Sequence, residues 1–135
     1  MDLEYLSEDD KALVERTRLF LRRRRSDISG VSAGLRTSTG KEYFGLCIDA
    51  KAATVGVCAE YSAVGAMVSD GGSRIRTVVA VVDKGHDRYS VLPPCGKCRD
   101  LVRAFGNPFV VLQVGRGITE LKKVRVSELI PFPWN

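Results

Sequence analysis

Two short segments of this sequence carry side chains suited to binding a metal ion, "CAE" at residues 58–60 and "PCGKC" at residues 94–98. Cys58, Cys95 and Cys98 each lie at or just before the expected start of a helix. Unpaired backbone N–H groups and the positive end of the helix dipole favour thiolate over thiol at such a position. The spacing of Cys95 and Cys98 lets one turn of chain offer both sulfurs to a single ion, and Zn²⁺ is the expected occupant of a thiolate site.

Glu60 gives this site a possible catalytic role. Three protein ligands leave one corner of a tetrahedral zinc ion for water, which is the arrangement of a catalytic site. Because Glu60 follows Cys58 so closely, its carboxylate can reach that water without being a ligand, accept its proton and pass it on. Hydrolytic deamination of an aminated ring needs this chemistry, and Cys-x-Glu with Pro-Cys-x-x-Cys is the all-cysteine form of the zinc deaminase pattern.

Other interpretations of the cysteines stay open at this stage. Cys47 could supply a fourth sulfur, which would close the site and make the zinc structural. Cys95 and Cys98 could form a redox pair, although that would leave Cys58 and Glu60 without a role. The cysteines could also be buried apolar thiols.

The composition is that of an ordinary globular protein. The chain has 135 residues, of which 44% are hydrophobic and 27% charged, and we expect one domain over residues 1–135. No apolar run approaches the roughly 20 residues of a membrane span. Because the first residues, "MDLEYLSEDDK", are acidic rather than basic and apolar, we expect a cytoplasmic location.

The net charge of +5 raises the possibility of a nucleic-acid partner. Much of the excess comes from the run Arg22–Arg25, at the end of an expected helix, where cations suit the negative end of the dipole. We interpret the run first as a solvated helix end and second as a phosphate or partner site. His86, the single histidine, is expected in an exposed loop.

The elements that position these residues can be predicted from periodicity and turn signals. They are a helix at 8–24, with a capping box from Ser7 and Asp10, a hairpin at 31–48, a helix from Cys58 to about residue 70, a strand at 76–83 followed by a polar loop, a helix at 95–105, a strand at 108–114, a weak strand at 119–126 and a short closing helix at 127–130. This order predicts an α/β fold with a central mixed sheet flanked by helices.

With these motifs in place, the chain resembles the small cytidine deaminase family, including its blasticidin S deaminase branch. The similarity covers nearly the whole chain: the hairpin "VSAGLRTSTGKEYFGLCIDA", the "CAE" motif, "PPCGKCRDLVRAF" and the closing "VSELIPFPW". The resemblance implies a three-layer α/β/α sandwich with a five-stranded mixed sheet, and a homotetramer. It also implies Zn²⁺ held by Cys58, Cys95 and Cys98, with Glu60 as the proton shuttle.

The sequence departs from the family around the expected substrate. Cys47-Ile48-Asp49 stands where cytidine deaminases carry Asn-x-Glu to bind the ribose hydroxyl; the Asp49 carboxylate can accept a hydroxyl hydrogen bond with a shorter arm, whereas a thiol replaces an amide poorly. Ser29 stands where an aromatic residue is frequent. The resemblance places substrate contacts at Cys47, Asp49, Ala59, Ser90, Pro93 and Trp134; packing of Trp134 on the core is the alternative.

A third departure concerns charge. Tyr61 follows Glu60, where many all-cysteine relatives have an arginine that offsets the negative charge of three thiolates. Lys97 or Arg99, both close to the cysteines in sequence, can take that role instead.

We therefore expect a zinc-dependent hydrolase that removes the exocyclic amine from a cytosine-type ring. The expected substrate is a small nucleoside or nucleoside analogue, cytidine-like or blasticidin S-like, and ammonia is the second product. The alternatives are a deaminase that edits polynucleotides and a catalytically silent zinc scaffold that assembles as an oligomer.

Overall fold

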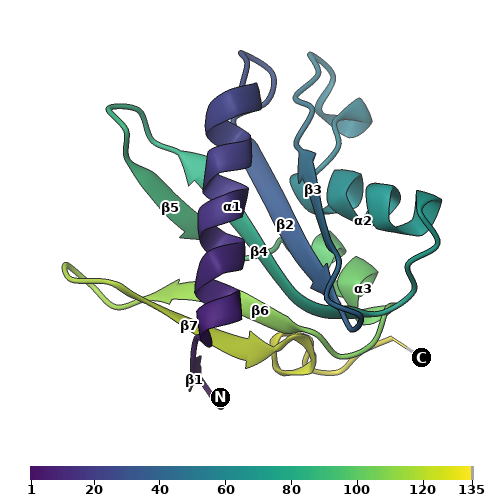
Figure 1. The fold of residues 1–135 in the computed structure, drawn as a ribbon. Coiled ribbons are helices and arrows are strands. Elements are labelled where there is room, and N and C mark those ends of the chain that lie inside the picture. Colours follow the sequence, from purple (N-terminus) through teal and green to yellow (C-terminus); the bar gives the residue numbers. More distant parts are fainter. Residues whose placement is uncertain (135) are drawn as a thin grey trace.

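The computed structural model describes residues 1–134, in which helices cover both faces of one mixed sheet (Figure 1). Helix α1 packs on β2 and β4 from one side. Helix α2 packs on β2 and β3 from the other, with α3 beside it. This is the predicted three-layer α/β/α arrangement. The elements are β1 Glu4–Tyr5, α1 Glu8–Arg24, β2 Val31–Thr37, β3 Glu42–Leu46, the 3₁₀ turn η1 Ala53–Val55, α2 Ala59–Ser69, β4 Ile75–Asp83, β5 Tyr89–Leu92, α3 Gly96–Arg103, β6 Phe109–Val114, β7 Glu120–Arg125 and η2 Val126–Leu129.

The sheet has seven strands in the described part of the chain, so the predicted count of five was wrong. The strand order is β1-β7-β6-β4-β2-β3, and β5 pairs with β4 beside this path. The two strands missed are β1, in which both residues are exposed, and β5, which falls in the expected polar loop. Each depends on an antiparallel partner elsewhere in the chain, β7 and β4 respectively. Such short runs have too little periodicity to predict a strand on their own.

Helix α1 begins and ends where the sequence predicts. The Ser7 hydroxyl accepts from the Asp10 amide, and the Asp10 carboxylate accepts from the Ser7 amide, which completes the capping box. Leu13 and Leu21 are fully buried and pack with the sheet residues Val79, Val81, Val91 and Val111. The basic residues of the last turn lie at the negative end of the helix dipole.

A buried ionic cluster fixes the start of α1 to the sheet. Asp10 is fully buried and accepts from Arg36 Nη2 at 2.8 Å, from Lys123 Nζ at 2.7 Å and from Thr77 Oγ1 at 3.3 Å. Burial alone would raise the pKa of the Asp10 carboxyl, but hydrogen bonds from Lys123, the Ser7 amide and Arg36 outweigh it and hold this pKa well below its usual range. One helix and three strands, β2, β4 and β7, are thereby linked.

Helix α2 approaches the sheet unusually closely at Gly45 of β3. A Cβ atom at this position would lie 2.3 Å from the Ala63 amide nitrogen and 2.6 Å from the Ser62 backbone carbon. Ala63 and Met67 are fully buried on this face. The missing side chain of Gly45 therefore sets how near α2, and the residues at its N-terminus, lie to the sheet.

The described residues contain no helix with both the length and the apolar composition required to span a bilayer.

Candidate active site

The starts of two helices bring three sulfur atoms together. Cys58 is the N-cap of α2, Cys95 is the N-cap of α3, and Cys98 lies in the first turn of α3. Their Sγ atoms all lie within 4.8 Å of one another, and those of Cys58 and Cys95 are 3.9 Å apart. Tetrahedral zinc with Zn–S bonds of about 2.3 Å would hold its sulfurs about 3.8 Å apart, so the three cysteines fit this ion.

The protonation chemistry of the cluster also calls for a cation. Burial raises the pKa of the Cys98 thiol far above its usual range, and the neighbouring Glu60 adds to the effect. The pKa of Cys58 is raised by burial and by Cys95. At Cys95 burial acts in the same direction, but hydrogen bonds from the Cys98 backbone and from the other two thiols reverse it and lower the pKa. The surroundings favour a thiolate only at Cys95, so holding all three cysteines as thiolates requires a positive ion between them.

Glu60 points into the same interior region. It lies in the first turn of α2 and its side chain is buried, with 6% of the residue exposed. Burial raises the pKa of its carboxyl, and hydrogen bonds from the Cys98 thiol and the Glu60 backbone offset part of that rise. A carboxyl group whose pKa is raised toward neutrality is suited to exchange protons with a reacting group.

A cavity of about 480 Å³ opens onto these residues. Cys58, Glu60 and Cys95 contribute to its wall. Of the predicted substrate contacts, the lining includes Cys47, Asp49, Ala59 and Pro93. The sequence did not predict Thr54, which lies between the expected hairpin and the helix from Cys58. It also did not predict Val31, Ala80 and Leu92, which reach the cavity only because the strands and helices are assembled.

Cys47, Ile48 and Asp49 follow one another along the wall of this cavity. Ser29 Oγ donates to the Cys47 carbonyl at 2.8 Å, and the Asp49 amide donates to the Ile28 carbonyl at 2.8 Å. Cys47 Sγ lies 3.9 Å from Asp49 Oδ2. Among the described residues Cys47 is not part of the three-sulfur group, so this arrangement does not support the structural four-cysteine alternative.

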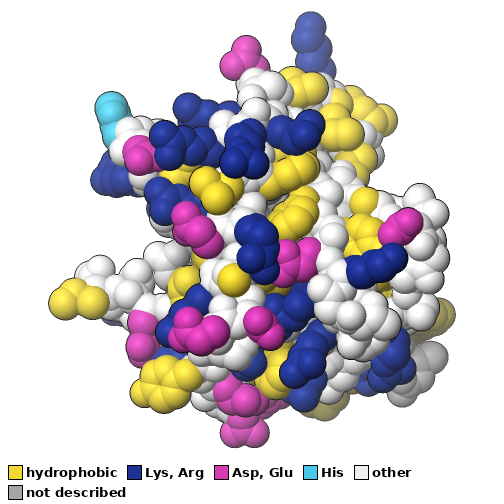
Figure 2. All heavy atoms as spheres, in the orientation of Figure 1, with side chains coloured by type: hydrophobic (Ala, Val, Ile, Leu, Met, Phe, Trp, Pro, Cys, Tyr) yellow, Lys and Arg dark blue, Asp and Glu magenta, His cyan; other side chains and the backbone are white. Residues whose placement is uncertain are grey.

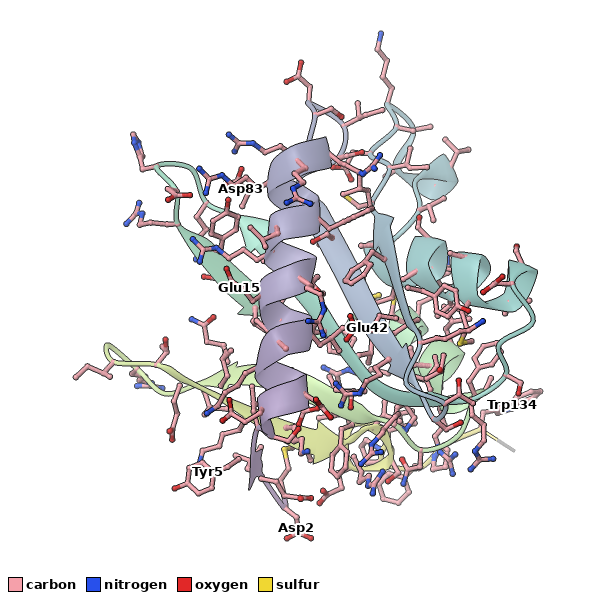
Figure 3. All side chains as sticks on the ribbon, viewed as in Figure 1. Asp2, Tyr5, Glu15, Glu42, Asp83 and Trp134 are labelled. Atoms are coloured by element: carbon pink, nitrogen blue, oxygen red, sulfur yellow. The ribbon has the colours of Figure 1, made fainter. Side chains whose placement is uncertain are left out.

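Two predicted contacts lie away from the cavity in the single chain. Ser90 lines a separate groove between β5 and α1. Trp134 is 98% exposed and lies beside α3, where Figure 3 labels it near the end of the chain, so the alternative of packing on the core was wrong. His86 is exposed, as predicted, in the turn between β4 and β5.

Lys97 and Arg99, the two candidate counter-charges for the thiolates, occupy different positions in the structure. Lys97 lines the cavity, and its Nζ atom lies 4.6 Å from the centre of the Tyr61 ring. Arg99 instead donates to the Pro94 carbonyl at 2.9 Å and to the Leu129 carbonyl at 3.1 Å. Of these two cations, Lys97 lines the cavity, whereas Arg99 holds the backbone that enters α3.

No family model matches the chain. A blasticidin-S deaminase from Bacillus cereus is 36% identical over 108 residues, which are 77% of this chain and 76% of that protein. The chain belongs to the blasticidin-S deaminase family. The resemblance drawn from the motifs is thereby confirmed.

Cytidine deaminases are among the solved structures that share this fold. The enzyme from Bacillus anthracis superposes with a TM-score of 0.78 at 19% identity, over 92% of this chain and 88% of that one. The enzyme from Mycobacterium leprae gives a TM-score of 0.74 at 21% identity, over 90% and 96%. At these identities the similarity establishes the fold.

Proposed function

We propose that this protein is a zinc-dependent hydrolytic deaminase that removes the exocyclic amine from a cytosine-type ring of a nucleoside or nucleoside analogue. The observation that carries the proposal is the meeting of three cysteine sulfurs beside the buried Glu60 carboxyl, in the wall of one cavity. Membership of the blasticidin-S deaminase family supports the reaction type. A zinc ion bound by Cys58, Cys95 and Cys98 would supply Lewis-acid activation of the attacking water.

Glu60 then moves the protons of the reaction. Its carboxylate accepts a proton from the attacking water and delivers it to the ring nitrogen as oxygen adds to the amine-bearing carbon. Glu60 then takes the second proton from the oxygen now bound to this carbon and gives it to the departing amine, so that the C–N bond breaks, a C=O bond forms and ammonia leaves. Burial of Glu60 suits both directions of transfer because it raises the pKa of the carboxyl.

The substrate is expected to be a small molecule that fits the cavity beside Asp49 and Thr54. Asp49 is exposed at the rim and can accept a hydroxyl or amine hydrogen bond. The name of the Bacillus cereus relative supports a nucleoside analogue of the blasticidin S type as the first compound to test.

The test is release of ammonia over a panel that contains cytidine, deoxycytidine and blasticidin S, with zinc measured in the same preparations. The Glu60→Gln variant should keep its zinc and lose turnover by about a hundredfold or more. Cys98→Ser should lose zinc, which separates loss of the metal from loss of the proton carrier. Wild-type protein that is free of zinc when active, or turnover unchanged by Glu60→Gln, would refute the proposal.

We also propose a cytoplasmic homotetramer. The resemblance to the family supports the subunit number, and reduced thiols suit that compartment. The exposed Phe132 and Trp134 are the kind of side chains that an adjoining subunit would cover. Light scattering coupled to size exclusion gives the subunit count, and a monomer at micromolar concentration would contradict it.

A further inference from the structure

The C-terminal end of α1 and the turn between β4 and β5 form a basic surface, defined here as residues 18–25 and 83–88. It contains seven Lys and Arg side chains and two Asp side chains, a formal excess of five. The excess equals the net charge of the whole chain, +5. The remaining residues carry equal numbers of basic and acidic side chains in sum, so the net positive charge of the chain is that of this surface. Figure 2 shows these side chains gathered in dark blue beside the single histidine.

The acidic groups within the basic surface are already paired. Asp87 Oδ1 lies 3.7 Å from Arg22 and 3.9 Å from Arg18, and Asp83 forms an ion pair with Arg25. Figure 3 shows Asp83 beside this end of α1. Glu15, one turn earlier, also lies near Arg18, at 3.7 Å.

Four cations of the basic surface have no carboxylate partner among residues 1–134. They are exposed and come from both elements: Arg23, Arg24, Lys84 and Arg88. A solvated helix end explains the last turn of α1, but it does not explain why the β4–β5 turn adds two more unpaired cations beside it. Cations converging from separate elements are the pattern of a phosphate-binding surface.

Aromatic rings lie beneath two of the guanidinium groups. Arg18 is 4.3 Å from the centre of the Tyr89 ring, and Arg24 is 5.4 Å from that of Phe20. Stacking of this kind holds a guanidinium flat. Arg24, which has no carboxylate partner among residues 1–134, is thereby available for bidentate contact with phosphate. Flat cationic and aromatic faces also suit unstacked bases, which single strands offer and acidic peptides do not.

The basic surface lies at the same end of the molecule as the cavity. The residues that follow Arg25 bend back through a bridge between Ser26 and Ser29, and the Ile28 carbonyl accepts from the Asp49 amide at the cavity rim. Figure 1 shows these loops together beyond the last turn of α1. The two sites have no lining residue in common.

We propose that the basic surface binds single-stranded nucleic acid through its phosphates, at a site separate from the cavity. Binding involves no covalent step and does not depend on the deaminase activity. The unpaired side chains Arg23, Arg24 and Arg88 make the principal contacts.

The test is fluorescence anisotropy with a labelled single-stranded RNA of about 20 nucleotides, long enough to exceed the site sizes usual for such proteins, over a range of salt concentrations. The triple variant Arg23→Gln, Arg24→Gln, Arg88→Gln should bind at least tenfold more weakly and reduce the slope of log K against log salt by about two. The matched control, Arg74→Gln, Arg76→Gln, Arg116→Gln, removes three exposed charges elsewhere and should retain most of the affinity.

Each outcome decides the proposal. Equal losses in both triple variants would show attraction by net charge alone and overturn it, as would absence of binding by the wild type at low salt. Competition by polyglutamate as effective as that by unlabelled RNA would indicate an acidic protein partner and also overturn it. Zinc content and thermal unfolding, measured on the same variants, establish that each is folded.

Discussion

Replacing Gly45 by Ala tests whether close contact between α2 and the sheet positions the cysteine cluster. The new Cβ would lie 2.3 Å from the Ala63 nitrogen, whereas ordinary contact begins at 3.4 Å. The obstacle is backbone, which no side-chain rotation relieves, so α2 must move outward by roughly 1 Å or β3 must bend. Overpacking of this kind costs about 1–3 kcal/mol of unfolding free energy.

The displacement also has a functional consequence, because α2 carries Cys58 and Glu60 and α3 carries the other two sulfurs. Moving one helix alone lengthens the 3.9 Å separation between Cys58 and Cys95. A misplacement of about 1 Å can cost a hundredfold in turnover. We expect Gly45→Ala to bind zinc more weakly and to lose turnover by up to that factor, with substrate affinity changing less.

The matched control is Gly65→Ala, on the same helix, where an added Cβ meets no atom within 4 Å. Because alanine favours a helix by up to about 1 kcal/mol over glycine, this variant should be slightly more stable than the wild type. Urea unfolding, chelator competition for zinc and ammonia release provide the three measurements. If Gly45→Ala matched the wild type in unfolding free energy and zinc affinity, the steric argument would be wrong.

Three further predictions follow from the contacts described above. Asp10→Asn should lower the unfolding free energy by about 3 kcal/mol in urea titrations, because Arg36 and Lys123 lose a buried charge; an unchanged midpoint would contradict the role of the ionic cluster. Folding lowers the pKa of Asp10, so Asp10 contributes to the unfolding free energy above its unfolded pKa of about 3.9, and this contribution falls as the pH drops below that value. In urea titrations at decreasing pH, Asp10→Asn should therefore lose less stability than the wild type. Lys97→Met should weaken zinc binding about tenfold in chelator competition. Cys47→Ser, which lies outside the three-sulfur group, should leave zinc affinity unchanged. Equal zinc affinities in Lys97→Met and the wild type would show that Lys97 is not the counter-charge.

Much of the fold could be predicted because its signals are local. The capping residues Ser7 and Asp10 and the apolar spacing of Leu13 and Leu21 determine α1 within one short window of chain. The placement of Cys58 and Cys95 at helix starts follows from the same kind of signal. These features require no knowledge of what the segments touch.

Part of the site could be predicted in type but not in position. The sequence contains Asp49, Ser90 and Trp134, but only the folded chain separates Asp49, at the cavity rim, from Ser90 and Trp134, which line other grooves. Lys97 and Arg99 were equivalent as candidate counter-charges. The Tyr61 ring and the Leu129 carbonyl, each on another element, give them different roles.

The sequence by itself determined the helices, the hairpin and the chemical nature of the cysteine and glutamate motifs, because periodicity, capping and residue type act within a few positions. Only the tertiary structure decided the strands β1 and β5, the walls of the cavity and the meeting of the helix α1 cations with those of the β4–β5 turn on one surface. Strand β5 is too short to be recognised without its neighbour β4. The other features join segments far apart in the chain, and their contacts become energetically favourable only once the sheet has brought them together.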